Sequence, residues 1–79
     1  MKKLKLHDIN GLLIEVGDIV ETKQPGGGIL PPGPPQIGIA EHCVDAFQRP
    51  NMQIKFRKEG QNFDRYILLD GKINTVIRR

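Results

Sequence analysis

Short runs of alternating apolar residues, separated by turn-forming dipeptides, constrain the fold of this chain most strongly. Asn10-Gly11 and Asp70-Gly71 are hairpin signals, because asparagine, aspartate and glycine tolerate the positive φ angles of tight turns. Apolar residues alternate with polar ones most clearly at Met52, Ile54 and Phe56. Such a period of two is typical of half-buried strands, and no stretch shows a convincing helical period. The sequence therefore predicts an all-β protein.

The turn signals divide the chain into seven predicted strands, approximately 3–7, 12–15, 18–23, 37–47, 52–58, 63–69 and 72–78. Asn10-Gly11 predicts a type I′ turn, with the Asp8 carboxylate bonding the turn backbone. The uneven spacing of Ile73, Val76 and Ile77 predicts a bulge in the last strand. Hairpins in series predict a small antiparallel SH3-like barrel with a long Pro/Gly-rich loop. An OB-like barrel is disfavoured, because it usually carries a helix for which there is no candidate.

The length of 79 residues predicts one domain spanning 1–79, with a small core. Cys43 is the single cysteine, so no disulfide within the chain stabilises that core, and we expect a homo-oligomer. A lone cysteine also fits a reducing cytoplasm. The basic start Met1–Leu6 is followed by no apolar run, so we expect no signal peptide. No stretch has the length of a membrane span, so the expected location is cytoplasmic without membrane contact.

The segment 24–36 is the predicted site of partner binding. Three glycines predict a flexible first half, and four prolines predict a second half close to polyproline II. Loops of this length are usually functional or disordered. Ile29 and Leu30 are two adjacent aliphatics that must pack on the barrel, on a sister subunit or on a partner. The candidate partner-binding residues are Ile29, Leu30, Pro31, Pro32, Pro34 and Pro35. The same prolines also match the P-x-x-P pattern of ligands for SH3 domains.

A mild basic balance permits nucleic-acid binding as an alternative. The formal net charge is +3 and the isoelectric point is near 9.3, which is also an ordinary solubility charge for a small domain. Tyr66 is a candidate for stacking a base or for a place at the edge of the core. The candidate phosphate contacts are Lys55, Arg57, Lys58, Arg65, Arg78 and Arg79.

Glu41-His42-Cys43 is the one run that invites a metal or catalytic interpretation. Neighbours on a strand point to opposite faces, so the imidazole and the thiol cannot converge on one ion or on each other. Gly26-Gly27-Gly28 lacks the lysine and the following helix of a phosphate-binding loop. We therefore expect no catalytic residue, no metal site and no cofactor.

Two resemblances supplement these inferences. Residues 6–20, with Asp8-x-Asn10-Gly11 and Gly17-Asp18-Ile19-Val20, resemble the opening of small β-barrel proteins of phages and mobile elements, such as the YopX-like family. That resemblance implies a genetic setting rather than an activity. Met52-Gln53-Ile54-Lys55 is similar to the V-Q-I-Y strand of type II dihydrofolate reductases, with lysine in place of the tyrosine. This second resemblance implies a small oligomeric pore reductase.

Taken together, the sequence predicts a non-catalytic binding or adaptor protein of a phage or mobile element. Its partner is a protein, or a second copy of the chain, held through the 24–36 loop. Nucleic-acid binding through the basic residues is the alternative, and a pore reductase is the remote one.

Overall fold

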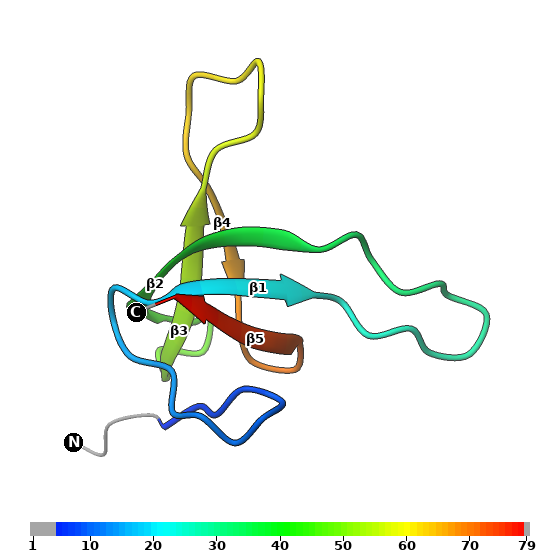
Figure 1. Cartoon of the computed structure of the whole chain (residues 1–79), viewed down its shortest axis with the longest axis horizontal. Coiled ribbons are helices and arrows are strands. Elements are labelled where there is room, and N and C mark those ends of the chain that lie inside the picture. The colour runs from blue at the N-terminus through cyan, green and yellow to red at the C-terminus, as the bar shows by residue number, and fades with distance from the viewer. Residues whose placement is uncertain (1–4, 79) are drawn as a thin grey trace.

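The computed structural model describes residues 5–78, which form a single antiparallel sheet without a helix (Figure 1). The five strands are β1 (Ile19–Lys23), β2 (Gln36–Val44), β3 (Pro50–Phe56), β4 (Arg65–Leu68) and β5 (Ile73–Arg78). Their order across the sheet is β4-β3-β2-β1-β5. The all-β prediction is confirmed.

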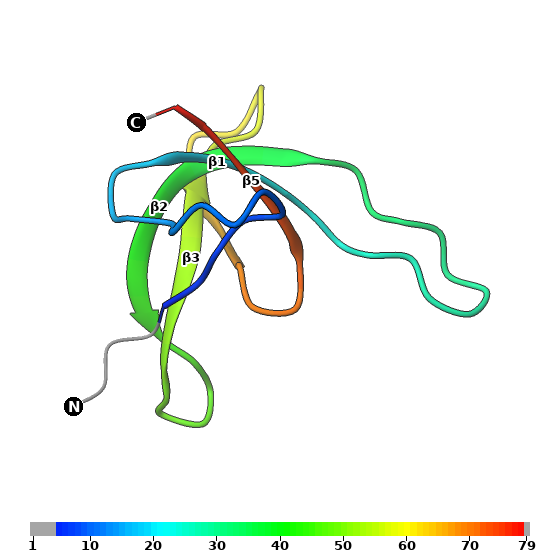
Figure 2. The same ribbon diagram turned by 60° about the horizontal axis from the view of Figure 1, so that its bottom comes forward.

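The central strand β2 bends strongly, as Figure 2 shows, and each half of it has a different neighbour. Its first half pairs with β1 and its second half with β3, and Ile39 lies opposite both Ile19 and Lys55. Gly38 is buried at this bend. A Cβ atom placed on Gly38 would lie 2.6 Å from the carbonyl oxygen of Lys55. The missing side chain of Gly38 therefore lets the backbone of β3 approach the concave face of β2.

The core lies on the concave face of the sheet. Met52 and Ile54 are buried and Phe56 is partly buried, so the predicted inward face of β3 is confirmed. Burying one large aliphatic side chain contributes about 1.5–3 kcal/mol, so a core of this size leaves a small margin of stability. The buried apolar residues are Ile14, Val20, Ala40, Met52, Ile54 and Leu69, and Leu6, Phe56, Ile67 and Val76 pack against them.

Two polar side chains are buried together beside this core. The Thr22 hydroxyl donates to Oδ1 of Asn74 at 2.6 Å, and Nδ2 of Asn74 donates to the carbonyl oxygen of Leu69 at 2.9 Å. Buried polar groups that are paired in this way avoid the free-energy cost of unpaired ones. The network links the ends of β1 and β5 to the residue that follows β4.

The N-terminal segment differs from its prediction. In place of strands 3–7 and 12–15, the described residues form one isolated bridge between His7 and Leu13, and residues 3 and 4 lie outside the described range. The turn between them is also not type I′, because Gly11 has a φ of 81° whereas the φ of Asn10 is not positive. The Asp8 N–H donates to the Leu12 carbonyl, which closes a three-residue loop.

The Asp8 carboxylate explains this turn. Its Oδ1 accepts hydrogen bonds from the N–H groups of Asn10 and Leu12, both at 2.9 Å. The predicted contact between Asp8 and the turn backbone is thus confirmed. Because these bonds hold Asn10 in a turn of negative φ, the positive angle is left to Gly11 alone.

The N-terminal segment also covers one edge of the sheet. The Ile9 N–H donates to the Asn74 carbonyl at 2.9 Å, and the Val76 N–H donates to Oδ2 of Asp8 at 3.0 Å. The outward-facing backbone of β5 is therefore occupied by the chain itself.

The predicted bulge in the last strand is confirmed, because the pairing of β5 with β1 shifts register between Ile19 and Val20.

Candidate binding site

The segment between β1 and β2 is an arm (residues 24–35) that projects from the sheet (Figure 1). The Gly33 N–H donates to the Gln24 carbonyl at 2.9 Å, and Gly27 and Leu30 exchange two backbone bonds of 3.2 and 2.9 Å. Gly28 has a φ of 57° at the first central position of this tip, which is typical of a type II′ turn. These bonds make the arm a hairpin, with its base at Gln24 and Gly33 and its tip at Gly27 and Leu30.

The tip of the arm presents two aliphatic side chains to solvent. Ile29 is 100% exposed and Leu30 is 67% exposed. Ile29 therefore does not pack on the rest of its own chain. Of the three predicted packing surfaces, a sister subunit and a partner protein remain. Its proline neighbours Pro31, Pro32, Pro34 and Pro35 are exposed as well.

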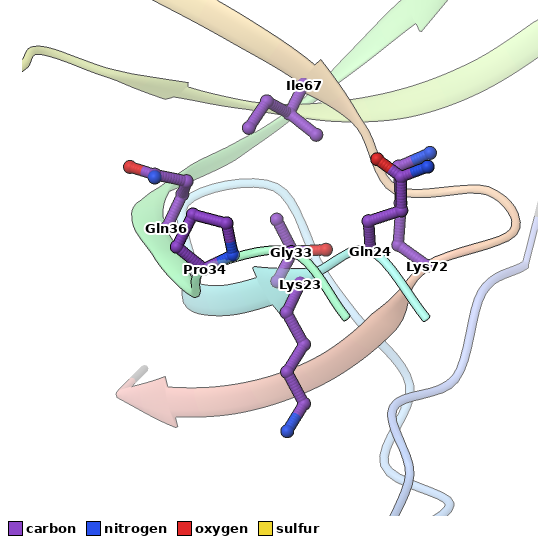
Figure 3. Close-up of a pocket in the computed structure, with 8 residues that line it drawn as sticks. Lys23, Gln24, Gly33, Pro34, Gln36, Ile67 and Lys72 are labelled. Carbon is purple, nitrogen blue, oxygen red and sulfur yellow. The ribbon is translucent and has the colours of Figure 1, made fainter. Parts of the chain in front are cut away.

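A pocket of about 260 Å³ lies at the base of the arm (Figure 3). Ile67 lies across one side of it, and Gln24 and Lys72 lie on the flank opposite Pro34 and Gln36. The side chain of Lys23 extends away from Ile67. The lining residues are Thr22, Lys23, Gln24, Gly33, Pro34, Gln36, Ile67 and Lys72.

The lining of this pocket is more apolar than polar. Both charged lining residues are lysines, and no acidic side chain is among the lining residues. Within residues 5–78, the side chains of Gln24, Gln36 and Lys72 make no hydrogen bond or ion pair. A ligand group with an aliphatic stem and an anionic end that accepts hydrogen bonds would complement this lining.

The predicted binding segment 24–36 contains Gln24, Gly33, Pro34 and Gln36 of this pocket, and sequence reasoning missed Thr22, Lys23, Ile67 and Lys72. Its residues come from the end of β1, both ends of the arm, the start of β2, β4 and the turn before β5. No local motif joins these segments. The one available signal is the alternation in β4, which places Ile67 on the concave face opposite Ile54.

The predicted basic residues are only partly gathered. Lys55 lies opposite Tyr66, and Arg65 lies opposite Phe56 on the same hairpin. Arg57 is paired with Asp64 at 3.2 Å, and Lys58 is exposed in the loop that follows.

The other two arginines lie elsewhere. Arg78 is at the opposite edge of the sheet, in the cross-strand row Arg78–Ile19–Ile39–Lys55–Tyr66. It is three strand spacings from Lys55, about 14 Å along the sheet. Arg79 lies outside the described residues.

The run Glu41-His42-Cys43 does not form a reactive centre. His42 is exposed, whereas Cys43 is partly buried and lies on the other face of β2. Burial raises the pKa of the Cys43 thiol, and the negative charges of Glu41 and Asp45 raise it further. The thiolate, which is the nucleophilic form, is therefore disfavoured at neutral pH. No group of three or more potential metal ligands occurs within the described part of the chain.

The residues similar to the reductase strand are placed on two faces of β3. Ile54 is buried in the core, whereas Gln53 is partly buried and its Nε2 donates to Oε1 of Glu41 at 2.6 Å. Lys55 lies two residues further along the same convex face as Gln53.

Comparisons of this chain with protein-family models, with curated proteins and with solved structures found no match. Residues 5–78 contain no helix that is long and apolar enough to cross a membrane.

Proposed function

We propose that this protein is a non-catalytic binding module that holds a protein partner through the tip of its arm. The observation that carries this proposal is the complete exposure of Ile29 on a hairpin that is hydrogen-bonded at its base and at its tip. Exposed aliphatic side chains are unfavourable in water, and a partner's pocket removes that surface from solvent. Because the arm is already ordered, binding loses less conformational entropy than it would with a flexible loop.

The setting of this function follows from the sequence and is part of the proposal. The opening motif supports a phage or mobile element, and the lone Cys43 supports a reducing cytoplasm. Homo-oligomerisation is a further part of it, since a small core gains stability from association. Light scattering during size-exclusion chromatography measures that state directly.

Replacing both Ile29 and Leu30 by serine is expected to abolish partner binding. The change removes the exposed apolar surface of the tip and leaves the backbone bonds of the arm in place. Losing such an anchor weakens binding by at least about thirtyfold. The measurement is a pull-down from nuclease-treated bacterial lysate, followed by titration of the purified partner.

A matched control carries serine at Ile9 and Val44, which are 65% and 62% exposed and lie away from the arm. This control is expected to retain the partner. A variant with residues 25–35 replaced by a short glycine–serine linker is expected to lose it. Retention of the partner by the Ile29→Ser, Leu30→Ser variant contradicts the proposal, and so does equal loss from the control.

Nucleic-acid binding is the second candidate, favoured by the cross-strand pair of Lys55 and Tyr66 on the convex face of the β3–β4 hairpin. This candidate predicts that affinity for duplex DNA falls steeply with salt, with a log–log slope of about 0.9 per phosphate contacted. Fluorescence anisotropy between about 50 and 200 mM salt measures the slope. Lys55→Gln is expected to reduce the slope by about one contact. Absence of binding at the lowest salt rejects this candidate.

A further inference from the structure

The second edge of the sheet is open. β4 pairs with β3 on one side, and on its other side no described residue hydrogen-bonds to it. β5 at the opposite edge is covered by Asp8 and Ile9. An unpaired strand edge is a template for another extended segment. The chain thus covers one of its two edges and leaves the other available.

The register identifies which backbone groups β4 offers. The Leu69 N–H donates to the Met52 carbonyl at 2.9 Å, and Ile67 lies opposite Ile54 in the same antiparallel register. In an antiparallel pair, alternate residues direct both backbone polar groups to the same neighbour. Ile67 and Leu69 therefore face β3. The N–H and C=O groups of Tyr66 and Leu68 face the open edge.

The side chains of β4 match this arrangement on both faces of the sheet. Tyr66 and Leu68 are 54% and 39% exposed on the convex face, where they would cover apolar atoms of an added strand. Ile67 is on the concave face and lines the pocket at the base of the arm. A residue opposite Ile67 on an added strand would have its Cβ about 5 Å from that of Ile67. Its side chain would consequently enter the pocket.

The lining of the pocket selects the chemistry of that side chain. Pro34 and Ile67 suit an aliphatic stem, and Gln24, Gln36 and Lys72 offer donors that have no partner in residues 5–78. Lys72 is the cationic residue beside Gln24, whereas the side chain of Lys23 extends away from Ile67 (Figure 3). A glutamate has the required stem and the required anionic end.

We propose that the open edge of β4 binds an extended segment of a partner protein, which adds a sixth strand and places an acidic side chain in the pocket beside Ile67. Main-chain bonds to Tyr66 and Leu68 supply affinity, and the pocket supplies specificity. This inference goes beyond the proposed function by assigning a second binding site and a class of partner segment. It does not require Ile29 or Leu30, so each idea can fail without the other.

The probe is a capped five-residue peptide with the order valine, threonine, glutamate, threonine, valine. Paired antiparallel to β4, its glutamate lies opposite Ile67 and its threonines lie opposite Tyr66 and Leu68. In ¹H–¹⁵N spectra of the full chain, the amides of Tyr66 and Leu68 are expected to shift with a dissociation constant of about 1 mM. The Ile29→Ser, Leu30→Ser variant is expected to bind this peptide equally well.

Two matched peptides separate backbone pairing from pocket recognition. Methylating the backbone nitrogens of the two threonines removes the donors to β4 and is expected to abolish the shifts up to about 10 mM. Exchanging the glutamate for glutamine is expected to weaken binding about threefold to fivefold. In the Lys72→Gln variant, the glutamate and glutamine peptides are expected to bind with equal affinity. Lys58→Gln makes the same charge change outside the pocket and is expected to preserve it.

Three results would overturn the proposal. The first is the absence of shifts at Tyr66 and Leu68 at about 10 mM peptide. The second is equal binding of the methylated peptide. The third is a shift of both amides with protein concentration alone, which would assign the edge to a second copy of the chain. None of these results bears on the pull-down with the arm variants.

Discussion

Replacing Gly38 by alanine is expected to lower the free energy of unfolding by about 2–3 kcal/mol. The new methyl group would lie 2.6 Å from the carbonyl oxygen and 3.0 Å from the carbonyl carbon of Lys55, and 3.1 Å from Cβ of Ile54. The obstacle is backbone in a paired strand, so it cannot move aside as the end of a side chain would. The lower entropy of the unfolded alanine chain offsets only about 0.4–1 kcal/mol of the clash.

The measurement for Gly38→Ala is thermal unfolding followed by circular dichroism. For a domain of this size, the expected loss corresponds to a fall in Tm of about 10–20 °C. Gly27→Ala is the matched control, because no atom lies within 4 Å of its added Cβ and its φ is not in the left-handed region. We expect the control to change the free energy by less than about 0.5 kcal/mol. Equal stability of the two variants would refute the packing argument.

Replacing Asp8 by alanine is expected to destabilise the protein by about 2–4 kcal/mol. The carboxylate accepts three backbone hydrogen bonds, from Asn10, Leu12 and Val76. Hydrogen bonds to charged groups contribute more than neutral ones, and Asp8 is buried, so water replaces them poorly. The loss both loosens the N-terminal turn and releases the edge of β5.

Urea denaturation measures the effect of Asp8→Ala, and hydrogen exchange at the Val76 amide locates it. Asp8→Asn separates the two roles, since one oxygen remains for the turn while an amide nitrogen faces the Val76 donor. Asparagine is therefore expected to leave an intermediate stability with fast exchange at Val76. Asp70→Ala is the control, because this exposed carboxylate makes no hydrogen bond within the described residues. Protected exchange at Val76 in Asp8→Ala would exclude the edge-covering role.

Sequence patterns predicted the features that depend on alternation within one strand. The hairpin predicted at Asp70-Gly71 was wrong, because β4 and β5 lie at opposite edges of the sheet. The alternation at Met52 and Ile54 identified the concave face of β3, because side chains of a strand must alternate between faces. The uneven spacing of Val76 and Ile77 identified the bulge in β5 for the same reason. Both inferences needed only the geometry of a single strand.

Features that depend on contacts between distant segments escaped prediction. Asn10-Gly11 favours a type I′ turn locally, and the Asp8 carboxylate selects a different one. Three consecutive glycines give no local signal for the arm, whose backbone bonds join Gly27 to Leu30 and Gln24 to Gly33. The pocket escaped prediction because Ile67 and Lys72 meet Pro34 only after the sheet has formed.

The bond between Asp8 and Val76 has a consequence for synthesis of the chain on the ribosome. The two residues are separated by 68 positions, so the turn at Asp8 gains this bond only after β5 has been made. β1 likewise lies between β2 and β5 and lacks one neighbour until β5 is made. Native pairing of the sheet is therefore completed only once β5 has left the ribosome. Pairing between strands that are distant in the sequence is slow. It leaves both edges of the partly formed sheet uncovered while neighbouring chains are nearby.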